Sequence, residues 1–263
     1  MEKAFNMKRV VVVLIAVAAV AIGYFMFQSI TSPAKAVAKQ ENVVQLASEQ
    51  SKVELNKTAP SRFNGKERKV AYLTFDDGPD LVFTPKILDK LKQHNVKATF
   101  FLLGENAEKF PNVVKRIANE GHVIGNHTYS HPNLAKVNEA EYHNQIIKTE
   151  EILNRLAGYA PKFIRPPYGE ILENQLKWAT EQNFMIVQWS VDTVDWKGVS
   201  ADTITNNVLG NSFPGSVILQ HSTPGGHLQG SVDALDKIIP QLKTKGARFV
   251  TLPSMFQTSK ERK

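Results

Sequence analysis

The chain contains no cysteine among its 263 residues. It can therefore hold neither a disulfide framework nor a thiolate zinc site, so any bound metal must rely on histidine, aspartate or glutamate. No internal repeat is evident in the sequence. Hydrophobic residues make up 42% of the chain, which is enough to bury a sizeable core. We therefore expect one large domain, alone or with appendages.

Residues 67–263 carry little net charge, and most of the net positive charge lies in the N-terminal region. The formal net charge is +7, but residues 1–66 hold nine Lys and Arg against four acidic residues, whereas residues 67–263 hold 23 against 21. A nucleic-acid-binding domain would need a basic stripe with interleaved aromatic residues, and residues 67–263 show none. The charge distribution therefore argues against a nucleic-acid partner and favours a membrane near the N-terminus.

The one long apolar run of the sequence lies at residues 10–27, preceded by Lys3, Lys8 and Arg9. As a helix, such a run nearly crosses the hydrocarbon core of a bilayer, and its polar face is missing, which argues against a buried core helix. We therefore predict that residues 1–30 form a membrane anchor or a signal peptide. The stretch "PAKAVAK" at 33–39 offers small residues spaced like a processing site, so both alternatives stay open.

Either alternative places the rest of the chain outside the cytoplasm. The flanking positive charges favour a cytoplasmic N-terminus, so we expect an extracytoplasmic protein that is membrane-anchored, or secreted after cleavage. Residues 31–66 are rich in Ser, Ala, Lys, Gln and Asn without clear periodicity, and they predict a flexible stem.

Beyond the stem, short apolar runs alternate with amphipathic stretches. Strands that are apolar throughout and separated by helices indicate a parallel sheet covered on its outside. We predict an α/β fold over residues 67–258, a distorted or incomplete (β/α) barrel of about seven parallel strands, followed by a tail at 259–263. The predicted strands are "VAYLTF", "ATFFLL", "HVIGN", "KFIRP", "FMIVQW", "SVILQH" and "RFVTL", and two clear helical patterns cover residues 84–95 and 233–246.

Polar residues gather where these strands end, which is where the active sites of such barrels lie. The first is the pair Asp76 and Asp77. Neighbouring side chains in a strand point to opposite faces, so these two carboxylates can converge only if the strand breaks, and "GP" at 78–79 is a suitable break. One carboxylate could then bind a metal while the other faces the metal-bound water. The competing interpretation is an ordinary turn that uses aspartate for local hydrogen bonds.

A second polar strand end contains His127 and His131, four residues apart. One helical turn would place both imidazoles on the same side, and Pro132 predicts that the turn ends there. Two histidines and one carboxylate from another strand end would make a three-ligand metal site with open positions for water. The metal would act as a Lewis acid, and the remaining carboxylate of the Asp76–Asp77 pair could act as a base. A metal-dependent hydrolase needs both.

Five motifs in order carry a resemblance to a known family. They are "TFDDGP", "HTYSHP", "RPPYG", "DTVDW" and "LQH", spread over residues 74–221. With them the chain resembles the NodB homology domain, the polysaccharide deacetylases of carbohydrate esterase family 4, over roughly residues 68–255. The resemblance implies a distorted (β/α) barrel that removes acetyl groups from N-acetylated sugars by metal-assisted hydrolysis.

The resemblance also implies roles for individual residues. Asp77, His127 and His131 would hold a divalent metal, for which we expect zinc before cobalt or another divalent ion. Asp76 would be the general base. His221 would be the general acid that protonates the leaving amine.

Further residues would support these groups. Asp192 would pair with His221 and favour its charged form. Arg165 would hold Asp76 through its guanidinium fork. The substrate-binding residues implied by the resemblance are Pro167, Tyr168 with its backbone N–H on the oxyanion, and Trp196 and Leu219 as walls of the acetyl pocket.

The motif pattern looks most like that of enzymes acting on N-acetylglucosamine in peptidoglycan or chitin. The segment "STPGGHLQG" at 222–230 is Gly-rich and departs from the loops of many members. We expect a monomer with an N-acetylated glycan as its partner. Two alternatives of other classes stay open: a glycan-binding wall or sporulation factor without turnover, and an iron(II) oxygenase, which shares the two-His-one-carboxylate ligand set.

Overall fold

The structure is a computed structural model that describes residues 70–223 and 227–263. The predicted anchor or signal (1–30) and stem (31–66) lie outside the described residues. Within the described part of the chain, none of the helices has the length and apolar character needed to span a bilayer.

A parallel sheet forms the centre of the domain, and its strand order is β5-β4-β3-β2-β1-β7-β6, with β8 paired to β1. All pairings between these strands are parallel. The strands are β1 (Val70–Asp76), β2 (Thr99–Leu102), β3 (Val123–Asn126), β4 (Phe163–Ile164), β5 (Met185–Ile186), β6 (Val191–Asp192), β7 (Ser216–His221) and β8 (Arg248–Phe249). The prediction of an α/β fold with a seven-strand incomplete barrel is confirmed by this seven-strand path, which is a curled half-barrel.

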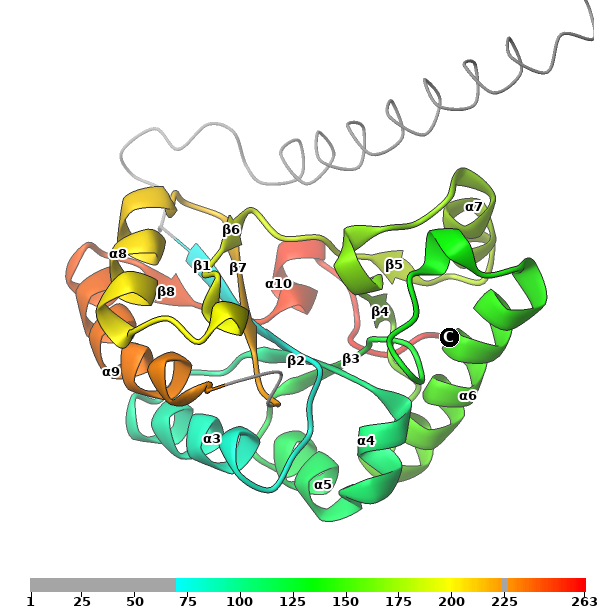
Figure 1. Ribbon diagram of the computed structural model, residues 1–263, viewed down its shortest axis with the longest axis horizontal. Helices are drawn as coiled ribbons and strands as arrows, with labels where there is room; N and C mark the ends of the chain where they lie inside the picture. Colours follow the sequence, from blue (N-terminus) through cyan, green and yellow to red (C-terminus); the bar gives the residue numbers. More distant parts are fainter. Residues whose placement is uncertain (1–69, 224–226) are drawn as a thin grey trace, which may run out of the picture. The chain divides into compact units, whose positions relative to one another are not determined.

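Strand β6 was missed by the sequence prediction, and its connection explains why. Only residues 187–190 separate β5 from β6, so no helix intervenes, yet the two strands occupy opposite ends of the sheet path. The chain therefore crosses the open side of the half-barrel from β5 to β6 (Figure 1). An alternation of strands and helices in the sequence gives no signal for such a direct crossing.

Helices cover the outer face of the sheet, except α10, whose Leu252 packs in the inner cluster with Tyr72 (Figure 1). They are α3 (Phe83–Gln93), α4 (Gly104–Lys109), α5 (Pro111–Asn119), α6 (Glu139–Ala157), α7 (Glu173–Glu181), α8 (Ala201–Asn211), α9 (Gln229–Thr244) and α10 (Leu252–Phe256). The 3₁₀ turns are η1 (Leu134–Lys136), η2 (Pro167–Gly169) and η3 (Asp195–Lys197). The two predicted helical patterns correspond to α3 and to α9, which begins earlier than residue 233.

Successive side chains of β1 point to opposite faces of the sheet, so the core has an outer and an inner layer. Leu73 and Phe75 belong to the large apolar cluster that also contains buried residues of the helices. Tyr72 belongs to a smaller cluster with Phe101, Phe163 and other residues, which fills the inside of the half-barrel. Thr74 and Asp76 share the inner face with Tyr72, so the polar end of β1 opens above this inner cluster.

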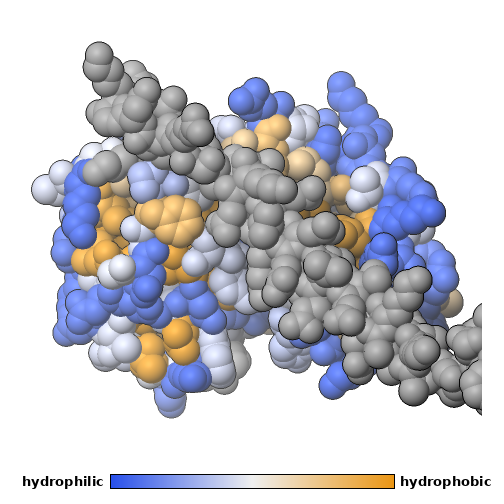
Figure 2. Space-filling view, turned by 90° about the horizontal axis from the view of Figure 1, so that it is seen from above, coloured by the Kyte–Doolittle hydropathy of each residue, from blue (hydrophilic) through white to orange (hydrophobic). Residues whose placement is uncertain are grey.

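The segment predicted as a tail packs on the domain. Arg262 makes a two-point ion pair with Glu150 of α6, at 2.5 and 2.6 Å, and Glu261 pairs with Pro161. On the face seen in Figure 2, hydrophilic residues lie along much of the margin and apolar residues show in patches between them. Among the residues that the structure describes, the large apolar side chains that are exposed are Leu81, Val82, Tyr168, Trp196 and Phe213.

Candidate active site

The adjacent carboxylates of Asp76 and Asp77 converge because the backbone leaves the strand between them. Asp76 is the last residue of β1, and Asp77 adopts a left-handed conformation with φ of 70°. Such a conformation costs a non-glycine residue on the order of 1–3 kcal/mol. Two hydrogen bonds hold the turn: Asn106 Nδ2 donates to the Asp77 carbonyl at 2.9 Å, and the Leu103 N–H donates to the Gly78 carbonyl at 2.9 Å.

His127 and His131 lie on the loop after β3, with ring centroids 5.0 Å apart. The predicted helical turn between them is wrong, because Thr128 and His131 have φ of 73° and 61°. Local side chains satisfy the N–H groups that a helix would use: the Thr128 N–H donates to Asn126 Oδ1 and the His131 N–H to Thr128 Oγ1. The two imidazoles share a side for reasons of loop geometry, not helical spacing.

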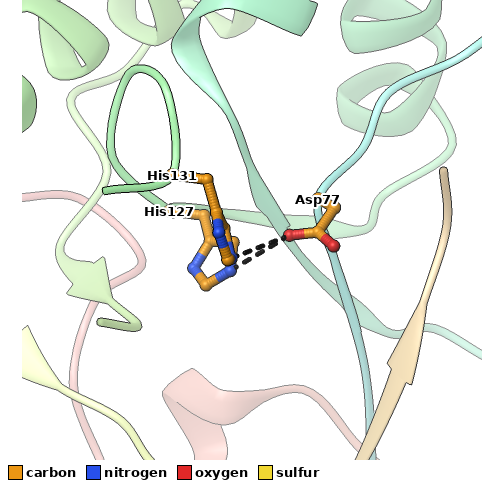
Figure 3. A group of neighbouring side chains, drawn as sticks. All are labelled: Asp77, His127 and His131. Atoms are coloured by element: carbon orange, nitrogen blue, oxygen red, sulfur yellow. Dashed lines mark ion pairs between the residues drawn. The ribbon is translucent and has the colours of Figure 1, made fainter. Parts of the chain in front are cut away.

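Asp77, His127 and His131 present ligand atoms to one another, as Figure 3 shows. Asp77 Oδ1 lies 3.3 Å from His127 Nε2 and 3.4 Å from His131 Nε2, and all three ligand atoms lie within 4.8 Å. Asp77 Oδ1 is buried and has no hydrogen-bond partner of proper geometry among the described residues. An orphaned buried carboxylate oxygen facing two imidazole nitrogens fits a divalent metal ion.

The tautomer of His127 suits the same role. Its Nδ1 lies 2.7 Å from the Arg165 carbonyl oxygen, which can only accept, so Nδ1 carries the proton and Nε2 keeps its lone pair toward Asp77. Burial works against the ionised form of Asp77, but the close approach of His127 and the nearby His221 and His131 lower the pKa of Asp77 to about 2. Asp77 is therefore ionised at neutral pH, as a metal ligand must be.

Asp76 is paired with Arg165 in the interior of the half-barrel. Arg165 is fully buried, and its Nη1 donates to Asp76 Oδ1 at 2.7 Å and to Thr74 Oγ1 at 2.9 Å. The remaining guanidinium donors reach the backbone carbonyls of Val187 and Gln188. The expected two-nitrogen fork is thus absent, and a single nitrogen carries the contact with Asp76. The structure thus places Arg165 against Asp76, the pair that the resemblance implied.

The predicted pairing of His221 with Asp192 is wrong, because Asp195 takes that place. The ring nitrogen Nδ1 of His221 lies 2.7 Å from Asp195 Oδ1, and the backbone N–H of His221 donates to Asp195 Oδ2 at 2.9 Å. Ser231 Oγ donates to the same Oδ2 at 2.8 Å. Asp192 instead accepts the Val194 N–H. The turn through Val194, with φ of 59°, swings the second aspartate of the motif toward β7.

The dyad changes the charge state of His221. Burial disfavours the imidazolium, but the hydrogen bond and charge of Asp195, together with Asp76 and Asp77, raise the pKa of His221 to about 9. His221 is therefore protonated at neutral pH. Because Nδ1 is bound to Asp195, the proton on Nε2 is the one available for transfer.

These groups line one cavity of about 450 Å³. Its wall contains three of the predicted substrate-binding residues, Tyr168, Trp196 and Leu219, whereas Pro167 is not part of the wall and its neighbour Pro166 is. Asp192 lies in the wall although it does not pair with His221. Residues that sequence reasoning missed are Asp195 as partner of His221, Ser231 behind it, and the wall residues Trp189, Thr223 and Leu228.

Comparisons with known proteins place this site in a family. The model of the polysaccharide deacetylase family matches residues 64–187. A peptidoglycan-N-acetylglucosamine deacetylase of Bacillus cereus is 94% identical over 202 residues, covering 76% of this chain and 74% of the relative. The chain belongs to the polysaccharide deacetylase family.

Two further relatives agree with this assignment. A second Bacillus cereus peptidoglycan-N-acetylglucosamine deacetylase is 53% identical and covers 95% of this chain and 93% of the relative. The crystal structure of a peptidoglycan N-acetylglucosamine deacetylase in complex with a 4-naphthalen-1-yl-N-hydroxybenzamide has 95% sequence identity and a TM-score of 0.74, covering 74% of this chain and 92% of that one. The chain is accordingly a polysaccharide N-deacetylase by family, as the motifs predicted.

Proposed function

We propose that this chain is a metal-dependent hydrolase that removes acetyl groups from N-acetylglucosamine residues of peptidoglycan. The observation that carries the proposal is the joint placement of the Asp77–His127–His131 group, Asp76 and a protonated His221 around one cavity. The names of the two Bacillus cereus relatives support peptidoglycan before chitin as the polymer.

Asp77, His127 and His131 would hold the metal, and we propose zinc, because two imidazole nitrogens and one carboxylate oxygen leave a position open for water. When bound, the ion supplies Lewis acidity that polarises the acetyl carbonyl and acidifies water. The ligand of the solved relative is a hydroxamic acid, a group that chelates divalent metals, and this supports a metal in the homologous site.

The two proton transfers fall to Asp76 and His221. Asp76 would accept the proton of the attacking water, and Arg165 compensates the charge of its carboxylate from the barrel interior. His221 would donate its Nε2 proton to the leaving amine, and Asp195 keeps the imidazolium charged and oriented. An acid and a base on the two sides of one cavity distinguish this site from that of an iron(II) oxygenase.

The cavity wall supplies the substrate contacts. Leu219 and Trp196 would enclose the acetyl methyl group, with Trp189 as a further aromatic wall. We propose that the Tyr168 backbone N–H stabilises the oxyanion, since Tyr168 has a left-handed backbone with φ of 58° at the cavity wall and its ring lies against His131.

An acetate-release assay on the metal-loaded full chain tests the proposal. Defined peptidoglycan fragments should yield acetate and free amines, and N-acetylglucosamine residues should react before N-acetylmuramic acid residues. Turnover on chitin oligomers alone would shift the substrate to chitin. Tight glycan binding without acetate release would favour the glycan-binding alternative, and oxygen consumption would favour the oxygenase.

We also propose that the catalytic domain lies outside the cytoplasm. It is either held at the membrane by residues 10–27 or released when the chain is cleaved near residues 36–39. The apolar run behind Lys8 and Arg9 supports this location, and peptidoglycan as substrate requires it. Cell fractionation should recover the full-length chain with membranes, and mass spectrometry of the mature N-terminus separates the anchor from the cleaved signal. A soluble cytoplasmic pool would contradict both.

A further inference from the structure

A buried glutamine of α6 contacts the loop that carries the two histidines. Gln145 is 4% exposed and lies on the buried side of the helix, where an amide is costly unless its donors and acceptors are satisfied. Its Oε1 accepts the N–H groups of Tyr129 at 2.8 Å and Ser130 at 2.9 Å. Its Nε2 donates to Ser130 Oγ at 2.9 Å and to Glu141 Oε1 at 2.8 Å. The entire amide of Gln145 is engaged.

The contacted residues are the middle of the His127–His131 loop. Thr128 and His131 both adopt left-handed conformations, which persist only when the surroundings enforce them. On the carbonyl side the loop is held by α4, whose first N–H groups donate to the Thr128 and Tyr129 carbonyls. On the N–H side it is held by Gln145. The loop is therefore clamped between two helices, and Gln145 is the side-chain half of the clamp.

The two histidines depend on this clamp to different degrees. His127 is buried, directly follows β3, and has Nδ1 fixed on the Arg165 carbonyl. His131 is more exposed, and its Nδ1 makes no hydrogen bond with any described residue; its ring contacts His127 and Tyr168 by its edges. The position of His131 Nε2 relative to Asp77 Oδ1 thus follows the backbone that Gln145 holds.

We propose that Gln145 is a positioning residue of the metal site, which keeps His131 within ligand distance of Asp77 by holding the Tyr129 and Ser130 N–H groups. This inference rests on the proposed function, because it gives the Asp77–His127–His131 group a metal to bind. Outer residues that orient metal ligands typically change metal affinity by about 10- to 100-fold when they are removed.

Equilibrium zinc binding to the full chain, measured by competition with a chromophoric chelator, tests the role without relying on turnover. Gln145→Leu removes the acceptor of both loop N–H groups, and the zinc dissociation constant should rise about tenfold or more. The exchange Glu141→Gln with Gln145→Glu keeps an acceptor oxygen for both N–H groups and a donor between the two side chains, so its dissociation constant should stay close to that of the unmodified chain. Gln145→Asn keeps a buried amide but is one methylene too short to reach both N–H groups, so its dissociation constant should also rise, and it serves if Gln145→Leu fails to fold.

Tyr159→Phe provides the matched control. Tyr159 is buried, and its hydroxyl accepts the Ile124 N–H at 2.8 Å near the start of β3, away from the histidine loop. The Tyr159→Phe variant should be less stable, because the buried Ile124 N–H is left unpaired, but its zinc affinity should be unchanged. Unchanged zinc affinity in Gln145→Leu, or equal weakening in Tyr159→Phe, would overturn the inference.

The outcome for Gln145 is separable from that for the proposed function. An unmodified chain that binds zinc but releases no acetate from any glycan would refute the deacetylase proposal and leave the Gln145 result standing. An unmodified chain that binds no divalent metal would overturn the Gln145 inference as well.

Discussion

The metal side and the acid side of this site are built by different means. On the metal side, Asp77 and His131 have left-handed backbone conformations; Asn106 donates to the Asp77 carbonyl, and Gln145 accepts the backbone N–H of Ser130, next to His131. On the acid side, His221 ends a regular strand and is fixed by a charged pair with Asp195. The metal side depends on backbone shape, and the acid side depends on electrostatics. Substitutions on the two sides should therefore fail in different measurements.

Asp76, which lies between the two sides, should show the largest effect on rate. Asp76→Asn removes the proposed general base but keeps the metal ligands, so kcat should fall by about 10²- to 10⁴-fold while zinc stays bound. Elemental analysis beside acetate release measures both quantities, and added zinc should restore nothing. Loss of the metal in this variant would mean that Asp76 is itself a ligand and that the base lies elsewhere.

Asp77→Asn should fail on the metal side. It removes the one charged ligand from a group of three, so zinc affinity should fall and excess zinc should restore part of the activity. A zinc titration of activity, run in parallel with Asp76→Asn, checks this. If Asp77→Asn retained zinc at full occupancy, the assignment of the two aspartates would be reversed.

The acid side should respond through pH. Because Asp195 raises the pKa of His221 to about 9, the protonated acid should persist below that pH and its loss should form the alkaline limb of the kcat profile. Asp195→Asn removes the charge that favours the imidazolium, so this limb should move to lower pH, with zinc affinity unchanged. Asp192→Asn is the matched control from the same motif and should leave the limb in place; a shift in Asp192→Asn alone would restore the original pairing.

The sequence predicted the chemistry of this site better than its geometry. The strand ends identified Asp76, Asp77, His127, His131 and His221, because polar residues after apolar runs are visible in one dimension. Which of two aspartates in "DTVDW" meets His221 depended on the left-handed turn at Val194, and no propensity indicates a left-handed valine.

Other parts of the structure were hidden for related reasons. Strand β6 has two residues and follows β5 without a helix, so the alternating pattern omits it. Gln145 lies in a helical stretch with no motif around it, and its role arises only when α6 packs beside the histidine loop. One sequence signal could have identified Gln145: an amide side chain on the apolar face of a helix, which is costly to bury unless it is hydrogen-bonded.

Ser231 offers the smallest and most selective test of the comparison. Its hydroxyl is the second donor to Asp195 Oδ2, beside the His221 N–H, and both Ser231 and Asp195 are about 1% exposed. Ser231→Ala removes one hydrogen bond, a change of roughly 0.5–1.5 kcal/mol, so kcat should fall by about two- to tenfold.

The same substitution should also change the pH profile. With one donor fewer, the Asp195 carboxylate attracts the His221 imidazolium more strongly. The alkaline limb of the kcat profile should therefore move slightly to higher pH, opposite to Asp195→Asn. Zinc affinity should not change, because Ser231 contacts only the acid side. A weakening of zinc binding comparable with that of Gln145→Leu would show that the two sides are mechanically joined, and a downward shift of the limb would show that Ser231 orients Asp195 more than it shields its charge.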